Sequence, residues 1–390
     1  MAYAYIKRKK AGWRMVRLIA TTAFGLEAVV KREVLALGFD NLNVLDGRVD
    51  FYGEITGIAK TNLWLRSADR VLLNMGEFTA LTFDELFEGT KALEWEQWIP
   101  INGKFDVTGK SVRSQLFSVP DCQAIVKKAV VERLKTRYKT DWFKEDGPEY
   151  KIQVGILKDR ATLTIDTSGL GLHKRGYRPK ASVAPLKETL SAALINLTYW
   201  RRERILLDPM CGSGTIPIEG ALLAKNIAPG VNRSFVSEGW PQMPARMWKD
   251  AREEARAAEI KDLRPQIFGS DIDPGAVELA KYNAKKAGVG EFIHFEAKAL
   301  KDLILPGGSG IAVCNPPYAE RLGTVSEVES LYADMRDVFS RDESWSLNVI
   351  TPDEFFEKIY GKKATQKRKL FNGRIKTDYY QYPGKKASGK

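Results

Sequence analysis

Hydrophobic and polar positions recur with two periods along the chain, and each change of period predicts a new strand or helix. Residues 16–22 predict a strand, and the apolar residues of 25–37 recur at helical spacing. Residues 43–51 predict a hairpin because Asp46-Gly47 suits a tight two-residue turn. With a helix predicted over 55–65, these elements predict a small α+β ferredoxin-like domain, which we place at residues 16–66 after a basic tail at 1–15.

A second α+β domain is predicted at residues 67–168. Strand-like runs occupy 71–78, 104–112, 150–157 and 160–166, and helical patterns occupy 83–98 and 122–139. A glycine-rich, basic stretch from Gly169 to Pro179 follows and is typical of a linker, which we place at 169–187. The remaining residues, 188–390, alternate apolar strands with helices, which predicts an α/β domain with a largely parallel sheet. Within it, helices are predicted over 248–259 and 331–339, and Asn372-Gly373 predicts a terminal hairpin.

The strongest local pattern lies at residues 204–225. An apolar run ends at Asp208-Pro209, turns through Cys211 to Gly214, and continues as a helix from Thr215. A strand, a glycine turn and a helix form a nucleotide site at the carboxyl end of a strand in an open α/β sheet. Glycines there can adopt positive φ and let a ligand approach the backbone. The turn lacks the lysine of a phosphate loop, so it identifies no ligand by itself.

Two later strands end in equally distinctive residues. One ends at Asp271-Ile272-Asp273, where Asp273 is expected to cap the next helix. Another, over 311–314, ends in Asn315-Pro316-Pro317-Tyr318. The three strand ends, in this order, resemble those of class I S-adenosylmethionine-dependent methyltransferases that modify exocyclic amino groups of bases. The resemblance implies a Rossmann-like methyltransferase sheet at the C-terminus, with S-adenosylmethionine as cofactor.

The resemblance also implies a cofactor site. In this interpretation Asp208 pairs with the cofactor's ammonium group, Asp271 accepts the ribose hydroxyls, and Ile272 packs on adenine. The acid that the family often carries after the next strand is absent or displaced in 296–300. The candidate cofactor-binding residues are Asp208, Pro209, Cys211, Gly212, Gly214, Thr215, Asp271 and Ile272.

The candidate catalytic residues are Asn315, Pro316, Pro317 and Tyr318. An exocyclic amine is a weak nucleophile because its lone pair is delocalised into the ring. The Asn315 side-chain oxygen and the Pro316 carbonyl can accept its two N–H groups, and the Tyr318 ring can stack on a base turned out of its helix. Neutral Asn315 is no general base, so the proton is expected to pass to solvent.

Residues 16–178 resemble the N-terminal region and THUMP domain of RNA methyltransferases. The similar strings include residues 20–27, 62–66, 110–116 and 172–178. This resemblance implies RNA binding, although a solvated basic face is an equal explanation for the helix at 122–139. The candidate RNA-binding residues are Lys110, Arg113, Lys127, Lys128, His173, Arg175 and Arg178.

Together the domains resemble the RlmL-type 23S rRNA guanine-N2-methyltransferases, so a single guanine-N2 methylation of 23S rRNA is expected. Three alternatives stay open: a tRNA guanine-N2-methyltransferase, an adenine-N6 DNA or RNA methyltransferase, and a non-catalytic RNA-binding assembly factor. The THUMP-like half favours RNA over DNA. The complete set of Asp208, Asp271 and Asn315 favours an enzyme over a non-catalytic factor.

Composition fits this interpretation. The 390 residues carry a net charge of +12, which favours a polyanionic partner. No apolar run of about 18 residues occurs, so no membrane span is expected. Three scattered cysteines and two histidines predict neither disulfides nor a metal site, and the expected compartment is the cytoplasm. The oligomeric state is left open.

Overall fold

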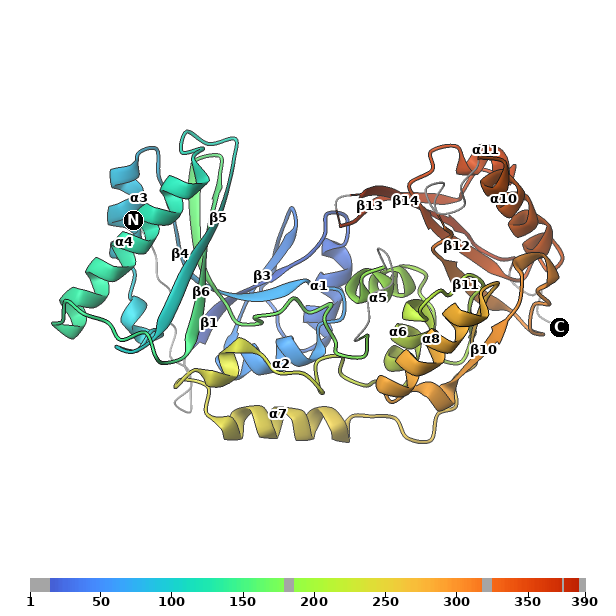
Figure 1. Cartoon of the computed structure of the whole chain (residues 1–390), viewed down its shortest axis with the longest axis horizontal. Helices are drawn as coiled ribbons and strands as arrows, with labels where there is room; N and C mark the ends of the chain where they lie inside the picture. Colours follow the sequence, from blue (N-terminus) through green and yellow to red (C-terminus); the bar gives the residue numbers. More distant parts are fainter. Residues whose placement is uncertain (1–14, 179–185, 318–324, 374, 386–390) are drawn as a thin grey trace. The chain divides into compact units, whose positions relative to one another are not determined.

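The computed structural model describes residues 15–178, 186–317, 325–373 and 375–385 (Figure 1). It divides into two compact units. Unit 1 comprises the chain up to Thr21, Lys31–Leu172 and Ser234–Glu254, and unit 2 comprises Thr22–Val30, His173–Arg233 and Ala255–Lys390. Tyr318, a predicted catalytic residue, lies outside the described residues.

The amino-terminal elements follow the predicted order closely. They are β1 (Met15–Thr21), α1 (Glu27–Ala36), β2 (Asn43–Leu45), β3 (Arg48–Glu54), α2 (Thr56–Trp64), β4 (Arg70–Thr79), α3 (Phe83–Lys91), η1 (Trp95–Gln97), β5 (Lys104–Val112), α4 (Val119–Tyr138), β6 (Glu149–Leu157) and β7 (Arg160–Asp166). The helix predicted over 83–98 ends at Lys91, and η1 is a separate turn. Buried Trp95 fixes that turn by donating its indole N–H to the Thr90 carbonyl at 2.8 Å.

The strands of unit 1 form one seven-stranded sheet in the order β2-β3-β1-β4-β7-β6-β5. Strand β4 pairs antiparallel with β1 on one side and with β7 on the other. The segments predicted as ferredoxin-like and THUMP domains therefore share a continuous sheet. At its far edge β5 and β6 run parallel, and α4 contacts both strands.

Unit 2 holds the elements of the predicted α/β domain. They are α5 (Glu188–Leu197), β8 (Ile205–Asp208), α6 (Thr215–Ala224), β9 (Ile267–Asp271), α8 (Pro274–Lys286), β10 (Ile293–Ala297), η4 (Leu300–Asp302), β11 (Gly310–Cys314), α10 (Val325–Ser340), β12 (Ser346–Thr351), α11 (Phe356–Tyr360), β13 (Gln366–Asn372) and β14 (Ile375–Tyr382). The sheet order is β10-β9-β8-β11-β12-β14-β13. The first five strands in this order, from β10 to β12, are parallel. The terminal hairpin β13–β14, predicted from Asn372-Gly373, adds two antiparallel strands.

Two apolar cores sandwich this sheet. One lies between the sheet and helices α5, α6 and α8, and the other between the sheet and helices α10 and α11 (Figure 1). All four residues of β8 are buried, because β8 lies between β9 and β11. From β8 the chain continues to β9 and β10 on one side and then crosses back to β11 on the other side. The carboxyl end of β8 is therefore the switch point where open α/β sheets bind ligands.

The sequence between α6 and β9 is divided between the units. It contains η2 (Val236–Gly239) and α7 (Ala245–Ala257), which begins three residues before the predicted 248–259. Ser234–Glu254 belongs to unit 1, where the Trp240 ring stacks on Tyr150 with centroids 4.9 Å apart. The Trp240 indole also donates to the Glu149 carbonyl at 3.0 Å. The hydropathy pattern around Trp240 predicts that the side chain is buried. It does not predict whether the side chain packs in unit 1 or in unit 2.

Candidate active site

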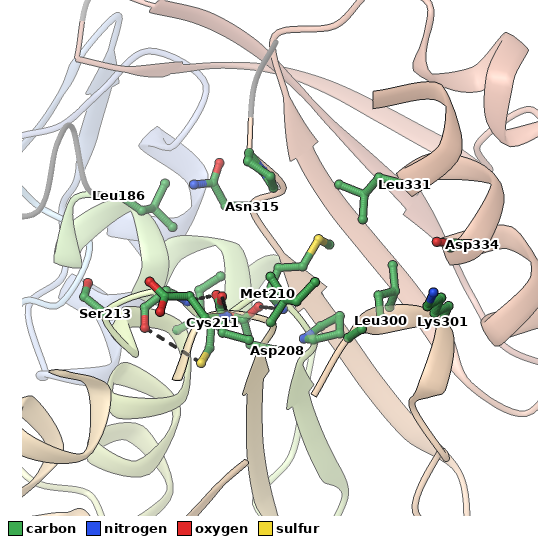
Figure 2. Close-up of a pocket in the computed structure, with 18 of the residues that line it drawn as sticks. Leu186, Asp208, Met210, Cys211, Ser213, Leu300, Lys301, Asn315, Leu331 and Asp334 are labelled. Carbon is green, nitrogen blue, oxygen red and sulfur yellow. Dashed lines mark hydrogen bonds between the residues drawn. The ribbon is translucent and has the colours of Figure 1, made fainter. Parts of the chain in front are cut away.

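A cavity of about 670 Å³ opens at the carboxyl ends of β8, β9 and β11 (Figure 2). All of it lies within unit 2. The three strand ends singled out in the sequence therefore meet at one cavity. The residues that line it are Leu186, Asp208, Pro209, Met210, Cys211, Gly212, Ser213, Thr215, Ile216, Asp271, Ile272, Asp273, Ala299, Leu300, Lys301, Asn315, Pro317, Glu327, Ser330, Leu331 and Asp334.

Asp208, the last residue of β8, presents a buried carboxylate to this cavity. One of its oxygens accepts the Met210 N–H at 3.2 Å. No lysine or arginine among the described residues forms an ion pair with it. Burial raises the pKa of Asp208 well above its ordinary value, and the nearby charge of Asp271 raises it further. A cationic group entering the cavity would therefore be attracted to this carboxylate.

The glycine turn after β8 depends on backbone geometry that only glycine adopts easily. Gly212 and Gly214 have φ of +51° and +80°. A Cβ on Gly214 would also lie 2.9 Å from the Cβ of Ala280 in α8. The turn is tied to the next strand, because the Cys211 N–H donates to the Ser270 carbonyl at 2.8 Å. This fixes the backbone around Gly212 at the wall of the cavity.

Asp271 ends β9 beside this turn. Its two carboxylate oxygens accept the N–H groups of Gly212 at 2.8 Å and Asp273 at 3.1 Å. These bonds orient the carboxylate and leave lone pairs for ligand hydroxyls. Asp273 caps α8 by accepting the Gly275 N–H, which confirms the predicted cap. Ile272 also lines the cavity and is 75% exposed, an unusual setting for a large apolar side chain.

The third strand end brings Asn315 and Pro317 to the cavity, and Pro316 is buried beside them. In Figure 2 Asn315 lies across the cavity from Asp208. Cys211 and Cys314 are buried, and burial raises the pKa of both thiols, so both stay protonated near neutral pH. They are poor nucleophiles and pack as small apolar residues.

Sequence reasoning missed one wall of the cavity. It consists of Ala299–Lys301 after β10 and of one face of α10, and α10 begins at Val325 rather than at the predicted Leu331. The α10 residues at the cavity are spaced three or four apart, so helical periodicity could have shown that they share a face. It could not have shown that this polar face meets a cavity. The residues are Glu327, Ser330, Leu331 and Asp334.

Arg175 is enclosed in unit 2. Its side chain is 2% exposed and donates to both oxygens of Glu219 in α6, at 2.9 and 3.1 Å. The Tyr177 hydroxyl donates to the same carboxylate at 3.0 Å. The expectation that Arg175 contacts RNA does not fit this placement, because the guanidinium is committed to a buried carboxylate.

Arg178 and His173 also differ from typical phosphate ligands. Arg178 pairs with Glu188 at 2.6 Å and donates to the Leu186 carbonyl and the Thr215 hydroxyl, both at 3.1 Å. Since Leu186 and Thr215 line the cavity, Arg178 supports its wall. Burial, with Lys187 and other nearby cations, lowers the pKa of His173 to about 4, so the ring is neutral at physiological pH.

The other four candidate RNA-binding residues lie in unit 1 and are exposed. Lys110 is on β5 and Arg113 follows that strand, whereas Lys127 and Lys128 are on α4. None of the four forms a salt bridge with another described residue. Their charges are available to a polyanion.

The sheet order and the three strand ends at one cavity define the class I methyltransferase arrangement. Comparison with known proteins gives the family. Residues 17–72 match the RlmL ferredoxin-like domain, residues 80–166 match the THUMP domain, and residues 175–381 match the RMKL-like methyltransferase domain. No helix among the described residues is long and apolar enough to cross a membrane.

Individual relatives agree with the domain matches. The chain is 52% identical to "Putative RNA methyltransferase YpsC" of Bacillus subtilis, over 94% of this chain and 95% of that protein. It is 33% identical to "Ribosomal RNA large subunit methyltransferase K/L" of Psychromonas ingrahamii, over 93% of this chain but only 49% of that protein. The solved structure of "SMU.472, a putative methyltransferase complexed with SAH" is 42% identical, with a TM-score of 0.90 over 97% of this chain and all of that chain.

The chain therefore belongs to the RMKL-like methyltransferase family, a family of S-adenosylmethionine-dependent RNA methyltransferases. The predicted fold class is confirmed, with ferredoxin-like, THUMP and methyltransferase domains in that order. The predicted family and cofactor are confirmed as well. The chain spans about half the length of its K/L relative.

Replacing one partner of the Arg175–Glu219 pair should destabilise the protein strongly. Arg175→Met or Glu219→Leu leaves one buried charge uncompensated, which costs about 3–5 kcal/mol. The double variant should recover much of this loss because both charges are gone. Urea unfolding followed by circular dichroism measures the effect. The exposed Arg264–Glu291 pair is the control, and its loss should cost at most about 1 kcal/mol. Equal, small effects at both pairs would contradict the prediction.

Asp208→Asn should stabilise the cofactor-free protein above neutral pH. The folded-state pKa of Asp208 lies above its unfolded value, so protonation favours folding and this contribution is lost as pH rises through the folded pKa. The variant should gain about 1–3 kcal/mol at pH ~8, the cost of an unsatisfied buried group, and nothing near pH ~4, the ordinary pKa of aspartate. Thermal unfolding across pH tests this, with exposed Asp262→Asn as control. A gain that does not depend on pH would contradict it.

Proposed function

We propose that this protein transfers a methyl group from S-adenosylmethionine to the exocyclic N2 amino group of a guanine in 23S rRNA. The observation that carries the proposal is that Asn315 and Pro317 line the same cavity as Asp208 and Asp271. Groups suited to a base amine thus face groups suited to the cofactor. The large-subunit rRNA specificity in the names of the K/L relatives supports the choice of substrate.

The cavity residues fit the cofactor. Asp208 is a buried carboxylate without a cationic partner among the described residues, and an ammonium group would supply one. Asp271 is already oriented by two backbone N–H groups and can accept a pair of hydroxyls. The positive φ of Gly212 and Gly214 lets a ligand lie against the backbone, and exposed Ile272 offers an apolar surface for a ring. Pro209, Cys211 and Thr215 complete the proposed cofactor contacts.

Asn315 and Pro316 are proposed to prepare the base. S-adenosylmethionine, when bound, supplies an electrophilic methyl group. The Asn315 side-chain oxygen and the Pro316 carbonyl accept the two amine N–H groups, which favours a more tetrahedral and more nucleophilic nitrogen. Pro316 and Pro317 hold φ near −65°, so these acceptors are pre-positioned. Rate enhancement then comes mainly from alignment and fixed dipoles. Neutral Asn315 takes no proton, so the amine proton passes to solvent.

The amino-terminal elements are proposed to select the RNA. Residues 80–166 match a THUMP domain, and exposed Lys110, Arg113, Lys127 and Lys128 can reach phosphates. Arg175 and Arg178 are excluded from this surface because they are paired with buried carboxylates. The division of labour proposed from the sequence assigns RNA recognition to residues 1–178 and chemistry to residues 188–390. The Arg175–Glu219 pair supports assigning the segment from His173 to the catalytic part.

Asn315→Ala should reduce methyl transfer at least about 100-fold while S-adenosylmethionine affinity changes less than about twofold, because the side chain faces the base. Asp271→Ala should instead weaken cofactor binding by about 2–4 kcal/mol through the loss of charge-assisted hydrogen bonds. Isothermal titration and tritium transfer to rRNA measure the two effects separately.

Asp334→Ala is the control for these variants, since this residue lines the far side of the cavity and is assigned neither role. If Asn315→Ala kept wild-type transfer, Asn315 would not be a catalytic residue. If the wild-type protein failed to bind the cofactor, the site assignment would be wrong.

Deleting the gene should remove N2-methylguanosine from 23S rRNA and leave tRNA nucleosides unchanged. Mass spectrometry of nucleosides from separated rRNA and tRNA measures this, and complementation with the Asn315→Ala variant is the matched control. Loss of the nucleoside from tRNA would favour the tRNA alternative. Loss of N6-methyladenosine would favour the adenine alternative.

A further inference from the structure

Unit 1 exposes apolar side chains at the carboxyl ends of its parallel strands β5 and β6. Phe117 is 83% exposed, Leu157 is 55% exposed and Val112 is 49% exposed. Val112 and Leu157 are direct partners in the β5–β6 register, so their side chains leave the same face of the sheet. We call this surface the β5 rim, formed by Lys110, Val112, Arg113, Phe117, Leu157 and Lys158.

The backbone of the β5 rim is held by a set of local hydrogen bonds. Asp159 accepts the Gln115 N–H at 2.6 Å, and its own N–H donates to the Ser114 hydroxyl at 3.1 Å. The Ser111 hydroxyl donates to the Leu116 carbonyl at 2.6 Å, and the Lys158 N–H donates to the Val112 carbonyl at 3.2 Å. Phe117 is therefore presented from a tied loop. A backbone that is already tied loses little conformational freedom when a ligand binds.

Three exposed cations accompany these apolar groups. Lys110, Arg113 and Lys158 are exposed, and none of them forms a salt bridge with a described residue. Two carboxylates of the same segments hold local hydrogen bonds: Asp159 accepts the Gln115 N–H, and Asp121 accepts the Ser118 hydroxyl at 2.5 Å. Lys110 pairs with Gly155 in the register, and its Cε would lie 3.6 Å from a Cβ on that glycine, so the lysine side chain lies over Gly155. The β5 rim thus combines exposed apolar side chains with cations that no described carboxylate pairs.

We infer that the β5 rim binds a single-stranded segment of the RNA substrate, with a base stacked on Phe117 and phosphates near Lys110, Arg113 and Lys158. Single-stranded nucleic acid is bound by aromatic side chains beside cations, because every base has a stacking face and every linkage a charge. An RNA duplex hides its base faces and would leave Phe117 without a ligand. The excess of cations favours a polyanion over a protein partner. This inference rests on the proposed RNA substrate. It adds that the RNA segment bound by unit 1 is single-stranded.

The test compares Phe117→Ala with Trp142→Ala in the full-length protein. Trp142 is the matched control, because it is a 79% exposed aromatic residue in unit 1 beyond the opposite end of α4. The ligands are a fluorescent uridine oligonucleotide, an abasic oligonucleotide of equal length, and an RNA duplex. The measurement is fluorescence anisotropy across a salt series.

Phe117→Ala should weaken binding of the uridine strand at least about fivefold, the lower end of the value of one base–aromatic stack. It should leave abasic-strand and duplex binding unchanged, and Phe117→Trp should restore the uridine preference. Replacing Lys110 and Arg113 by alanine should instead lower the salt slope for both single strands, because phosphate contacts are lost. Trp142→Ala should change none of these values.

Three outcomes would overturn the inference: equal effects of Phe117→Ala and Trp142→Ala, equal losses for uridine and abasic strands, or a loss confined to the duplex. Cofactor titration of each variant is run in parallel and should not change, because the β5 rim is in unit 1 and the cavity is in unit 2. Failure of the proposed methylation would appear in the nucleoside analysis, which does not depend on these binding measurements.

Discussion

The Asp208 carboxylate lies at the end of a strand enclosed by its neighbours, and the rest of the candidate site is arranged around this buried charge. Strand β8 is fully buried because β9 and β11 flank it and the two apolar cores cover its faces, and the ends of the three strands meet at the same place. The glycine turn, Asp271 and Asn315 are neighbours for that reason. A carboxylate without a counter-ion costs stability in the cofactor-free protein. In the function we propose, the same cost becomes binding energy when the cofactor's ammonium group pairs with this carboxylate.

A second buried constraint joins the segment after the THUMP domain to the catalytic unit. Arg175 and Arg178 reach Glu219 and Glu188, so a run of residues that is strongly basic in the sequence is largely neutralised in the structure. Arg178 then supports the cavity wall through Leu186 and Thr215. The net charge of +12 therefore overstates how many cations an RNA would meet along this segment. In unit 1 the exposed cations include those of the β5 rim and of α4.

Local patterns were sufficient for most elements and for the strand-end motifs. Asp46-Gly47 and Asn372-Gly373 fix their hairpins because these pairs suit tight turns, and Asp273 caps α8 as expected. Predictions failed where packing decides the outcome. The helix predicted through residue 98 stops at Lys91, because buried Trp95 turns the chain. The start of α10 was also missed, so one wall of the cavity was not foreseen.

The sequence alone determined the order of the domains and the three strand ends, because turn residues and strand periodicity act over a few neighbours. The cofactor class followed from the resemblance of those strand ends to a known family. Tertiary structure decided which charges are exposed. Arg113 and Arg175 have the same chemistry and similar basic surroundings in the sequence, yet one is exposed after β5 and the other is paired with Glu219. Tertiary packing also determines that Trp240 stacks on Tyr150. Such pairings join residues far apart in the chain, and no local pattern records which partner a side chain meets when it is buried.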